Sequence, residues 1–238
     1  MQILSSIIFS SLMVLVQACG ANKSSISSPP SDHNKHVNEA DKKDTYPVKE
    51  YIDSQELGSY SQAIFAGGCF WCTEAAFERI SGVVDVISGY SGGNKEYPGY
   101  YEVGEGKTGH AEAIFIFYDG GLITYETLLE VFFVAHDPTT LNRQGPDSGE
   151  EYRSAIYFQT GEEQKLIDLK IKELNASDSY VDKIVTEVAP YKEFWVAESY
   201  HQNYYELNPD HGYVRNVSKP KVDKVIKTFP ELIKLDYR

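Results

Sequence analysis

Residues 62–80 read QAIFAGGCFWCTEAAFERI and predict a strand, a tight turn and a helix. The run at 62–66 is a short strand that ends at Gly67 and Gly68, which allow the backbone to turn tightly. From residue 70 to residue 80 the apolar side chains recur at helical spacing, which gives this helix one buried stripe. Cys69 therefore falls at the start of a helix, directly after a strand.

The segments that follow continue the alternation of strands and helices. The core order is strand, helix, strand, strand, helix, strand, which favours an α+β fold over a doubly wound sheet. We expect a two-layer α/β plait, the ferredoxin-like β-α-β-β-α-β core, with extra helices and loops. The expected elements after residue 80 are strands at 83–90, 111–118, 154–158 and 184–188, and helices at 124–135, 162–174 and 198–207.

The composition limits the classes of partner. The 238 residues include 22 Lys and Arg against 35 Asp and Glu, which gives a formal net charge of −13. Such a chain is poorly suited to nucleic acid, whose phosphate backbone requires a Lys- and Arg-rich surface. Anionic lipid headgroups would repel it as well. Apolar residues make up 42% of the chain, enough to bury one sizeable core.

The N-terminus predicts export. Residues 1–18 are apolar or small almost throughout, and Cys19 follows them in a pattern that resembles a bacterial lipoprotein processing site. We expect residues 1–19 to be a signal peptide of the lipoprotein type, with Cys19 lipidated and the protein held in the cell envelope. A plain signal peptide or an uncleaved anchor is the alternative. Residues 20–58 are polar and have no apolar period, so we expect a flexible tether there.

Two of the three cysteines, Cys69 and Cys72, lie three residues apart in the turn that opens the first helix. The unpaired N–H groups and the dipole of a helix start favour a thiolate at Cys69. Cys72 lies about one helical turn further on, on the same face and within reach of a disulfide after modest adjustment. This arrangement is typical of redox sites, in which one thiol attacks the substrate and the second thiol then forms a disulfide with it.

Two neighbouring thiols can also bind zinc or belong to a thioredoxin-like fold. A structural zinc site needs further ligands, and the sequence has no second Cys pair. Zinc deaminases place His-x-Glu before Pro-Cys-x-x-Cys, whereas here the His-Ala-Glu triplet at 110–112 follows the thiols and Gly68 precedes Cys69. A thioredoxin-like fold is the stronger competitor, because its C-x-x-C also follows a strand and opens a helix.

Several long motifs, in the same order, resemble those of A-type peptide methionine sulfoxide reductases. They cover roughly residues 60–212: GGCFWC at 67–72, GYSGG at 89–93, YPGYYEV at 97–103, TGHAEA at 108–113, HDPTTLNRQGPDSGEEYRSAIY at 136–157 and AESYHQNYYELNP at 197–209. The resemblance implies a catalytic domain at 59–212 that reduces methionine (S)-sulfoxide, in proteins and as the free amino acid, to methionine. Residues 213–238 lie outside or at the edge of it, and their apolar spacing predicts a helical tail docked on the domain.

The resemblance also implies roles for single residues. Cys69 would be the nucleophile, Cys72 the resolving thiol, and Glu112 the acid that protonates the sulfoxide oxygen. Phe70 and Trp71 would form an apolar box for the methyl group of the substrate. The residues that would orient the oxygen are Tyr100, Asp147 and Tyr152.

The implied cycle passes through a Cys69 sulfenic acid and a Cys69–Cys72 disulfide, which a thioredoxin-like donor reduces. It needs no metal and no bound cofactor, and its partners are oxidised proteins and the external reductant. Two other functions stay open from the residues themselves. One is a thiol–disulfide oxidoreductase that uses only the two cysteines, and the other is an adhesin or redox-sensing lipoprotein without turnover.

Overall fold

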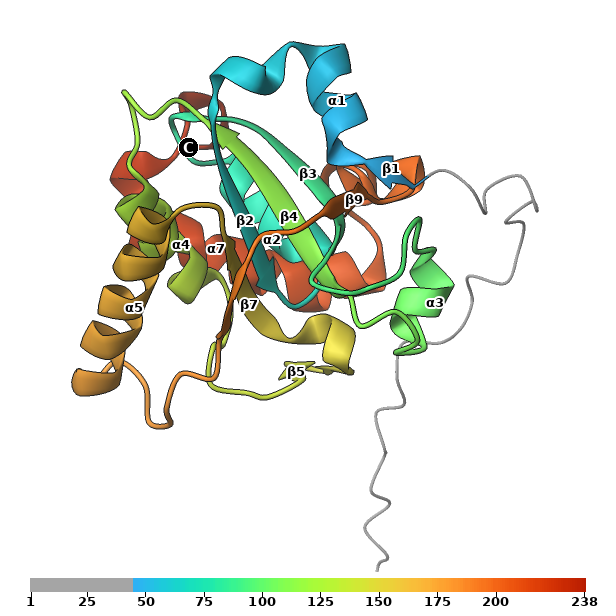
Figure 1. Ribbon diagram of the computed structural model, residues 1–238. Helices are drawn as coiled ribbons and strands as arrows, with labels where there is room; N and C mark the ends of the chain where they lie inside the picture. Colours follow the sequence, from blue (N-terminus) through green and yellow to red (C-terminus); the bar gives the residue numbers. More distant parts are fainter. Residues whose placement is uncertain (1–44) are drawn as a thin grey trace, which may run out of the picture.

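The computed structural model describes residues 45–238, and its centre is a seven-stranded sheet in the order β1-β9-β3-β4-β2-β7-β8 (Figure 1). The four central strands pair with one another in antiparallel fashion: β3 with β4, β4 with β2, and β2 with β7. They are β2 (Ser61–Gly67), β3 (Val83–Ser91), β4 (Ala111–Tyr118) and β7 (Ser154–Phe158). The strands expected in these places are confirmed, and so is a mixed α/β fold.

Shorter strands extend the sheet at both edges. On one side β9 (Phe194–Val196) pairs with β3, and β1 (Tyr46–Pro47) pairs with β9. On the other side β8 (Glu187–Pro190) runs parallel to β7, three residues later than the strand expected at 184–188. A separate pair of two-residue strands, β5 (Arg143–Gln144) and β6 (Asp147–Ser148), forms a small hairpin beside the sheet.

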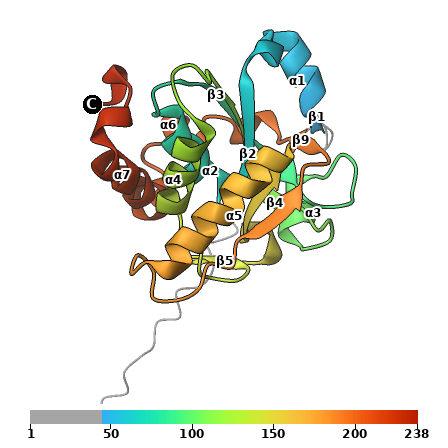
Figure 2. The same ribbon diagram turned by 60° about the vertical axis from the view of Figure 1, so that its left-hand side comes forward.

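Helices cover one face of the sheet, and Figure 2 shows them gathered on the side away from α1. Apolar side chains from this face and these helices form one buried core, in which the rings of Phe65 and Phe132 lie 4.9 Å apart. The helices are α2 (Phe70–Glu78), α4 (Tyr125–Ala135), α5 (Gly161–Ala176) and α7 (Lys219–Thr228). The single buried stripe expected for the first helix is wrong, because α2 is buried on almost every side between the sheet, α4 and α7. Cys69 lies where β2 leads into this helix and belongs to the same core.

The opposite face of the sheet packs against the beginning of the described chain. Val48, in α1 (Val48–Gln55), and Leu57 are buried with Ile64, Phe115 and other residues in a second apolar cluster. The expected tether at 20–58 is therefore wrong for residues 45–58. Two apolar side chains and the β1–β9 pairing anchor this stretch, although its composition is polar. Residues 1–44, with the expected signal peptide and Cys19, lie outside the described residues.

The single helix expected at 198–207 is also wrong. The chain forms a tight helical turn at Ser199–His201, then passes through Asn203 at a φ of 54°, and only then forms the one-turn α6 (Tyr204–Leu207). The reason is a tertiary contact. The Gln202 side chain accepts a hydrogen bond from the Ser88 N–H at 2.9 Å and donates one to the Ser88 carbonyl at 3.0 Å, which holds the turn against β3.

The C-terminal tail docks on the domain as a helix, as expected. Val222 and Val225 of α7 are buried in the main core, and α7 packs against α2 and α4. A π-helical turn at Val214–Ser218 leads into α7 and brings that segment next to the thiol pair. Within residues 45–238 no helix is long and apolar enough to cross a membrane.

Candidate active site

The turn between β2 and α2 places the two cysteines in one buried position. Gly68 has a φ of 84°, and a Cβ there would lie 2.4 Å from Cγ of Gln144, so only glycine fits. Cys69 then caps the N-terminus of α2, and its carbonyl accepts a hydrogen bond from the Cys72 N–H at 3.1 Å. Both cysteines are buried, and both are free thiols.

Burial disfavours the thiolate of both cysteines, but their mutual hydrogen bond shifts the two pKa values in opposite directions. Removal from water raises the pKa of Cys69 well above its ordinary value, and its hydrogen bond with Cys72 adds to the rise. That same bond lowers the pKa of Cys72 to about 7. The expected thiolate at Cys69 is therefore not favoured in this structure, because burial outweighs the helix start.

Glu112 is the acidic group beside the nucleophile. It lies on β4, a strand whose residues are all buried, and its Oε2 accepts a hydrogen bond from the Phe70 N–H at 3.0 Å. Burial raises the pKa of Glu112 well above its ordinary value, although the Phe70 N–H opposes part of that rise. A carboxyl that keeps its proton near neutral pH can act as a general acid. The strand register thus places a buried carboxyl, whose pKa is raised, at the first turn of α2.

Aromatic side chains form one wall of the site. The Trp71 indole stacks on Tyr204, with ring centroids 3.7 Å apart and planes 10° apart, and meets Tyr213 edge-on at 5.8 Å. The Trp71 Nε1–H donates to His201 Nδ1 at 3.2 Å. His201 in turn lies 5.0 Å from the Phe70 ring. Phe70 and Trp71 therefore lie in one aromatic cluster with side chains from the segment after residue 198, and their role as a box for a methyl group stays a prediction.

The three residues expected to orient an oxygen surround the same position. Tyr100 begins α3 (Tyr100–Gly104), and burial followed by the charge of Glu112 raises its pKa. The same two causes, in the same order, raise the pKa of Tyr152. Asp147 accepts a hydrogen bond from the Tyr213 hydroxyl, and burial raises its pKa. The structure thus brings all eight predicted site residues together.

Several side chains of the site were not predicted from the sequence. Buried Glu198 accepts from the Tyr90 hydroxyl at 2.8 Å and from the Tyr100 N–H at 2.9 Å, so it fixes the start of α3. Ser218 Oγ lies 3.2 Å from Cys72 Sγ. Glu198 stands inside the AESYH motif, which could have drawn attention to it. Tyr213 and Ser218 stand in the tail, where no motif marked them.

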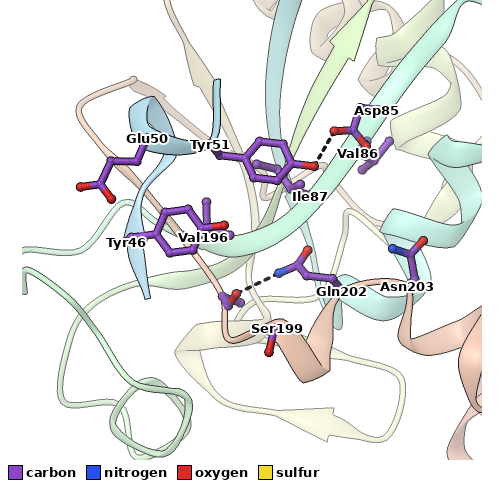
Figure 3. A pocket seen from close by; sticks show the side chains of 11 residues that line it. Tyr46, Glu50, Tyr51, Asp85, Val86, Ile87, Val196, Ser199, Gln202 and Asn203 are labelled. Carbon is purple, nitrogen blue, oxygen red and sulfur yellow. Dashed lines mark hydrogen bonds between the residues drawn. The ribbon is translucent and has the colours of Figure 1, made fainter. Parts of the chain in front are cut away.

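A cavity of about 480 Å³ lies between α1 and the β3–β9 edge, on the far side of the His201 turn (Figure 3). Tyr51 donates from its hydroxyl to Asp85 across it at 2.8 Å, and Gln202 lines its floor. Neither cysteine lines this cavity. Elsewhere in residues 45–238, no group of three or more His, Cys, Asp or Glu side chains is placed to hold a metal ion.

Comparisons with known proteins agree with this geometry. The family model described as peptide methionine sulfoxide reductase matches residues 61–232. The peptide methionine sulfoxide reductase of Haloquadratum walsbyi is 52% identical over 169 residues, which cover 71% of this chain and 96% of that protein. The chain belongs to the peptide methionine sulfoxide reductase family. The reductase of Natronomonas pharaonis is 48% identical over 171 residues, which cover 72% of this chain and 96% of that protein.

Solved structures of methionine sulfoxide reductases share the fold. The reductase of Corynebacterium diphtheriae matches with a TM-score of 0.58 at 32% identity, over 64% of this chain and 76% of that one. The reduced form of Mxr1 from Saccharomyces cerevisiae matches with a TM-score of 0.57 at 35% identity, over 63% of this chain and 87% of that one. The expected activity is confirmed: this reductase is an enzyme that reduces methionine sulfoxide. The family model extends through residue 232, so the resemblance does not end near residue 212 as expected.

Proposed function

We propose that the protein reduces methionine (S)-sulfoxide, in proteins and as the free amino acid, through a Cys69 sulfenic acid and a Cys69–Cys72 disulfide. The observation that carries this proposal is the contact between the nucleophile turn and the acid. The backbone N–H of Phe70, the residue after Cys69, donates a hydrogen bond to Glu112 Oε2 at 3.0 Å. Cys72, one helical turn away, is hydrogen-bonded to Cys69. Nucleophile, acid and second thiol therefore share one buried site.

In the first step the Cys69 sulfur attacks the sulfoxide sulfur while Glu112 donates a proton to the oxygen. The oxygen passes to Cys69, so that Cys69 becomes a sulfenic acid and methionine leaves. The proton that the Cys69 thiol loses replaces the one that Glu112 gave. Phe70 and Trp71 hold the methyl group, and the hydroxyls of Tyr100 and Tyr152, beside Asp147, orient the oxygen.

In the second step Cys72 attacks the sulfenic acid, a disulfide forms and water leaves. A thioredoxin-like donor then reduces the disulfide by thiol–disulfide exchange. The atoms and electrons of this cycle balance with two thiols and an external reductant, so the proposal includes no bound metal or organic cofactor. Oxidised proteins and the thioredoxin-like donor are the partners.

The decisive test offers the enzyme a methionine sulfoxide peptide as separate (S) and (R) epimers, with thioredoxin as reductant. We expect stoichiometric methionine from the (S) epimer and very little from the (R) epimer. Equal rates with both epimers would contradict the stereochemistry. Reduction of an insulin disulfide without sulfoxide reduction would identify a thiol–disulfide oxidoreductase instead.

We also propose that the four central strands and helices α2 and α4 constitute the β-α-β-β-α-β plait. The antiparallel order β3-β4-β2-β7 supports this arrangement. The flanking strands and α1 are then additions to it, on the far face and at the edges. Circular dichroism of a chain that begins at residue 59 would test it, because the core should keep its secondary structure without α1.

We propose that the protein is exported and anchored in the cell envelope through a lipid on Cys19. The apolar run at 1–18 and the Cys-Gly pair that follows it support this proposal. Substitution Cys19→Ala should move the enzyme from the membrane fraction to the soluble fraction, and mass spectrometry of the N-terminal peptide should find the lipid. An unmodified Cys19 in a membrane-bound protein would favour an uncleaved anchor instead.

A further inference from the structure

Lys221 is a half-buried cation near the thiol pair that has no part in the steps above. Lys221 lies in the first turn of α7, three residues after Ser218, whose hydroxyl is 3.2 Å from Cys72 Sγ. Side chains at this spacing lie on the same face of a helical segment. The Lys221 Nζ atom is withdrawn from solvent, and in the described part of the chain, residues 45–238, it has no hydrogen-bond partner.

An ammonium in this position needs a compensating negative charge. Removing such a cation from water is unfavourable unless an anion or several hydrogen bonds replace its hydration. The Lys221 charge favours the ionised forms of three acidic groups, namely Cys69, Cys72 and Asp147. Asp147 already accepts the Tyr213 hydroxyl, and Cys69 keeps its proton because of its burial. Of the acids that line the cavity beside Lys221, Asp182 is exposed and Asp137 accepts two hydrogen bonds from Thr139. The Cys72 sulfur, 3.2 Å from the Ser218 hydroxyl one turn before Lys221, is the group that we assign to the Lys221 charge.

The surroundings of Lys221 supply no other buried cation. Lys221 lines a cavity of about 550 Å³ together with Gln144, which packs against the turn at Gly68, with His136, and with the acids Asp137 and Asp182. Burial lowers the pKa of His136 to about 4, so this neighbour is neutral near pH 7. Lys224 lines the same cavity but is exposed to solvent. Lys221 is therefore the cation placed to act on the thiols.

The other titratable groups that act on Cys72 do not favour its thiolate in the same way. Cys69 on its own helix donates a hydrogen bond that lowers the pKa of Cys72, and the Ser218 hydroxyl does the same to a smaller degree. The acids that face the thiol pair from other elements resist a second negative charge there. They are Glu112 on β4, Asp147 on β6 and Tyr213 before α7.

We propose that the Lys221 ammonium stabilises the Cys72 thiolate while that thiolate attacks the Cys69 sulfenic acid. The inference rests on the proposed function, in which Cys72 is the resolving thiol. In this step a bond forms between the two sulfurs and the S–O bond of Cys69 breaks. The hydroxide that leaves takes up the proton that Cys72 released, which gives water. Cys72 is oxidised and the sulfenic sulfur is reduced, so Lys221 is a positioning residue that acts through Cys72.

The test follows one turnover of the full enzyme with one equivalent of methionine sulfoxide peptide across a series of pH values. Methionine release reports the first step, and the Cys69–Cys72 disulfide, measured by mass spectrometry, reports the second. Lys221→Met removes the charge and keeps the length of the side chain, and Lys221→Arg keeps the charge. Lys224→Met, an exposed lysine of the same helix, is the matched control. Lys221→Gln replaces the Met variant if the latter does not fold.

In Lys221→Met we expect the pH midpoint of disulfide formation to rise by about one unit, the effect of one nearby opposite charge. Near pH 7 the thiolate fraction of Cys72 then falls from about one half to about one tenth, so the second step slows about fivefold, and at high pH it regains the rate of the unmodified enzyme. Lys221→Arg and Lys224→Met should keep the original midpoint. An unmoved midpoint in Lys221→Met overturns the proposal.

A second measurement separates this inference from the proposed function. In the Cys69→Ser background, the ultraviolet absorbance of the Cys72 thiolate is titrated with and without Lys221→Met. A higher Cys72 pKa without the lysine supports the electrostatic role even where the unmodified enzyme forms no disulfide, an outcome that would refute Cys72 as the resolving thiol. Equal titrations of the two proteins overturn the role of Lys221.

Discussion

The backbone N–H of Phe70 donates to the Glu112 carboxyl at 3.0 Å, so the residue after the nucleophile also holds the acid. The two residues are 42 positions apart in the sequence, and the register of β4 beside β2 brings them together. Burial raises the pKa of Glu112 while this main-chain donor limits the rise. A single hydrogen bond thus positions the Glu112 carboxyl and limits the rise in its pKa.

Cys69→Ser should abolish sulfoxide reduction. Serine has almost the same shape, so the fold of the turn is kept, but its hydroxyl is not a nucleophile toward sulfur at neutral pH. Methionine release from a sulfoxide peptide is the measurement, and a thermal melt close to that of the unmodified enzyme is the control. Substantial residual turnover would remove Cys69 from the role of nucleophile.

Glu112→Gln should slow methionine release by about 100-fold or more, the usual contribution of a general acid. The glutamine oxygen can still accept from the Phe70 N–H, so the site keeps its geometry and loses only the proton. Rapid-quench measurement of the first turnover separates this step from disulfide formation. A first turnover as fast as that of the unmodified enzyme would mean that another group supplies the proton.

Cys72→Ser should still release one methionine per enzyme, because the first step uses Cys69 and Glu112. The product should then accumulate as a Cys69 sulfenic acid, since the described domain contains no other cysteine. Turnover with thioredoxin should collapse, and a small thiol such as dithiothreitol should restore part of it. A chain that begins after residue 20 excludes Cys19 as a substitute, and normal turnover of this variant with thioredoxin would show that Cys72 only packs.

Glu78 should make a contribution to stability that is lost as the pH rises from about 5 to 7, whereas buried His136, whose pKa is lowered to about 4, contributes in the opposite sense. Burial, followed by repulsion from Glu206, raises the pKa of Glu78 from 4.5 to about 7. At Glu78 the folded state therefore binds more protons than the unfolded state in this range, and this contribution to the free energy of unfolding decreases as those protons are lost. In Glu78→Gln the free energy of unfolding should change by about 1 kcal/mol less over this pH range, a figure that allows for the partial exposure of the side chain.

Urea denaturation at several pH values measures the contribution of Glu78. The matched control is Glu96→Gln, because Glu96 is exposed and its replacement should leave the pH dependence of stability as it is. A slope that is the same in Glu78→Gln and in the unmodified protein would assign the effect to other buried carboxyls, of which Glu74 and Glu112 are two.

Val225→Ala should destabilise the protein by about 2 kcal/mol, because it leaves a cavity in the core between α7 and the rest of the domain. Val181→Ala is the control, since the Val181 side chain is fully exposed and should be neutral. Thermal denaturation compares the two. A melting temperature for Val225→Ala equal to that of the control would mean that the tail contributes nothing to the stability of the domain.

Local sequence signals predicted the core elements and the chemistry on them. The apolar run at 111–118 coincides with β4, and the strand at 154–158 coincides with β7. The same signals failed where distant contacts decide the structure. Gln202 breaks the expected helix by bonding to Ser88, and residues 45–58 join the sheet despite a polar composition. The contributions of Tyr213, Ser218 and Lys221 to the site were missed for the same reason, since only the docking of α7 brings them to the thiols.

The two outermost strands of the sheet determine how readily another extended chain can pair with this protein. An exposed sheet edge is a template on which another extended chain can add, and this leads to aggregation. Here one edge is β1, two residues long and ending at Pro47, and the other is β8, four residues long and ending at Pro190. Proline has no N–H to donate to a neighbouring strand. A methionine sulfoxide reductase built in this way offers an extended polypeptide little backbone to pair with.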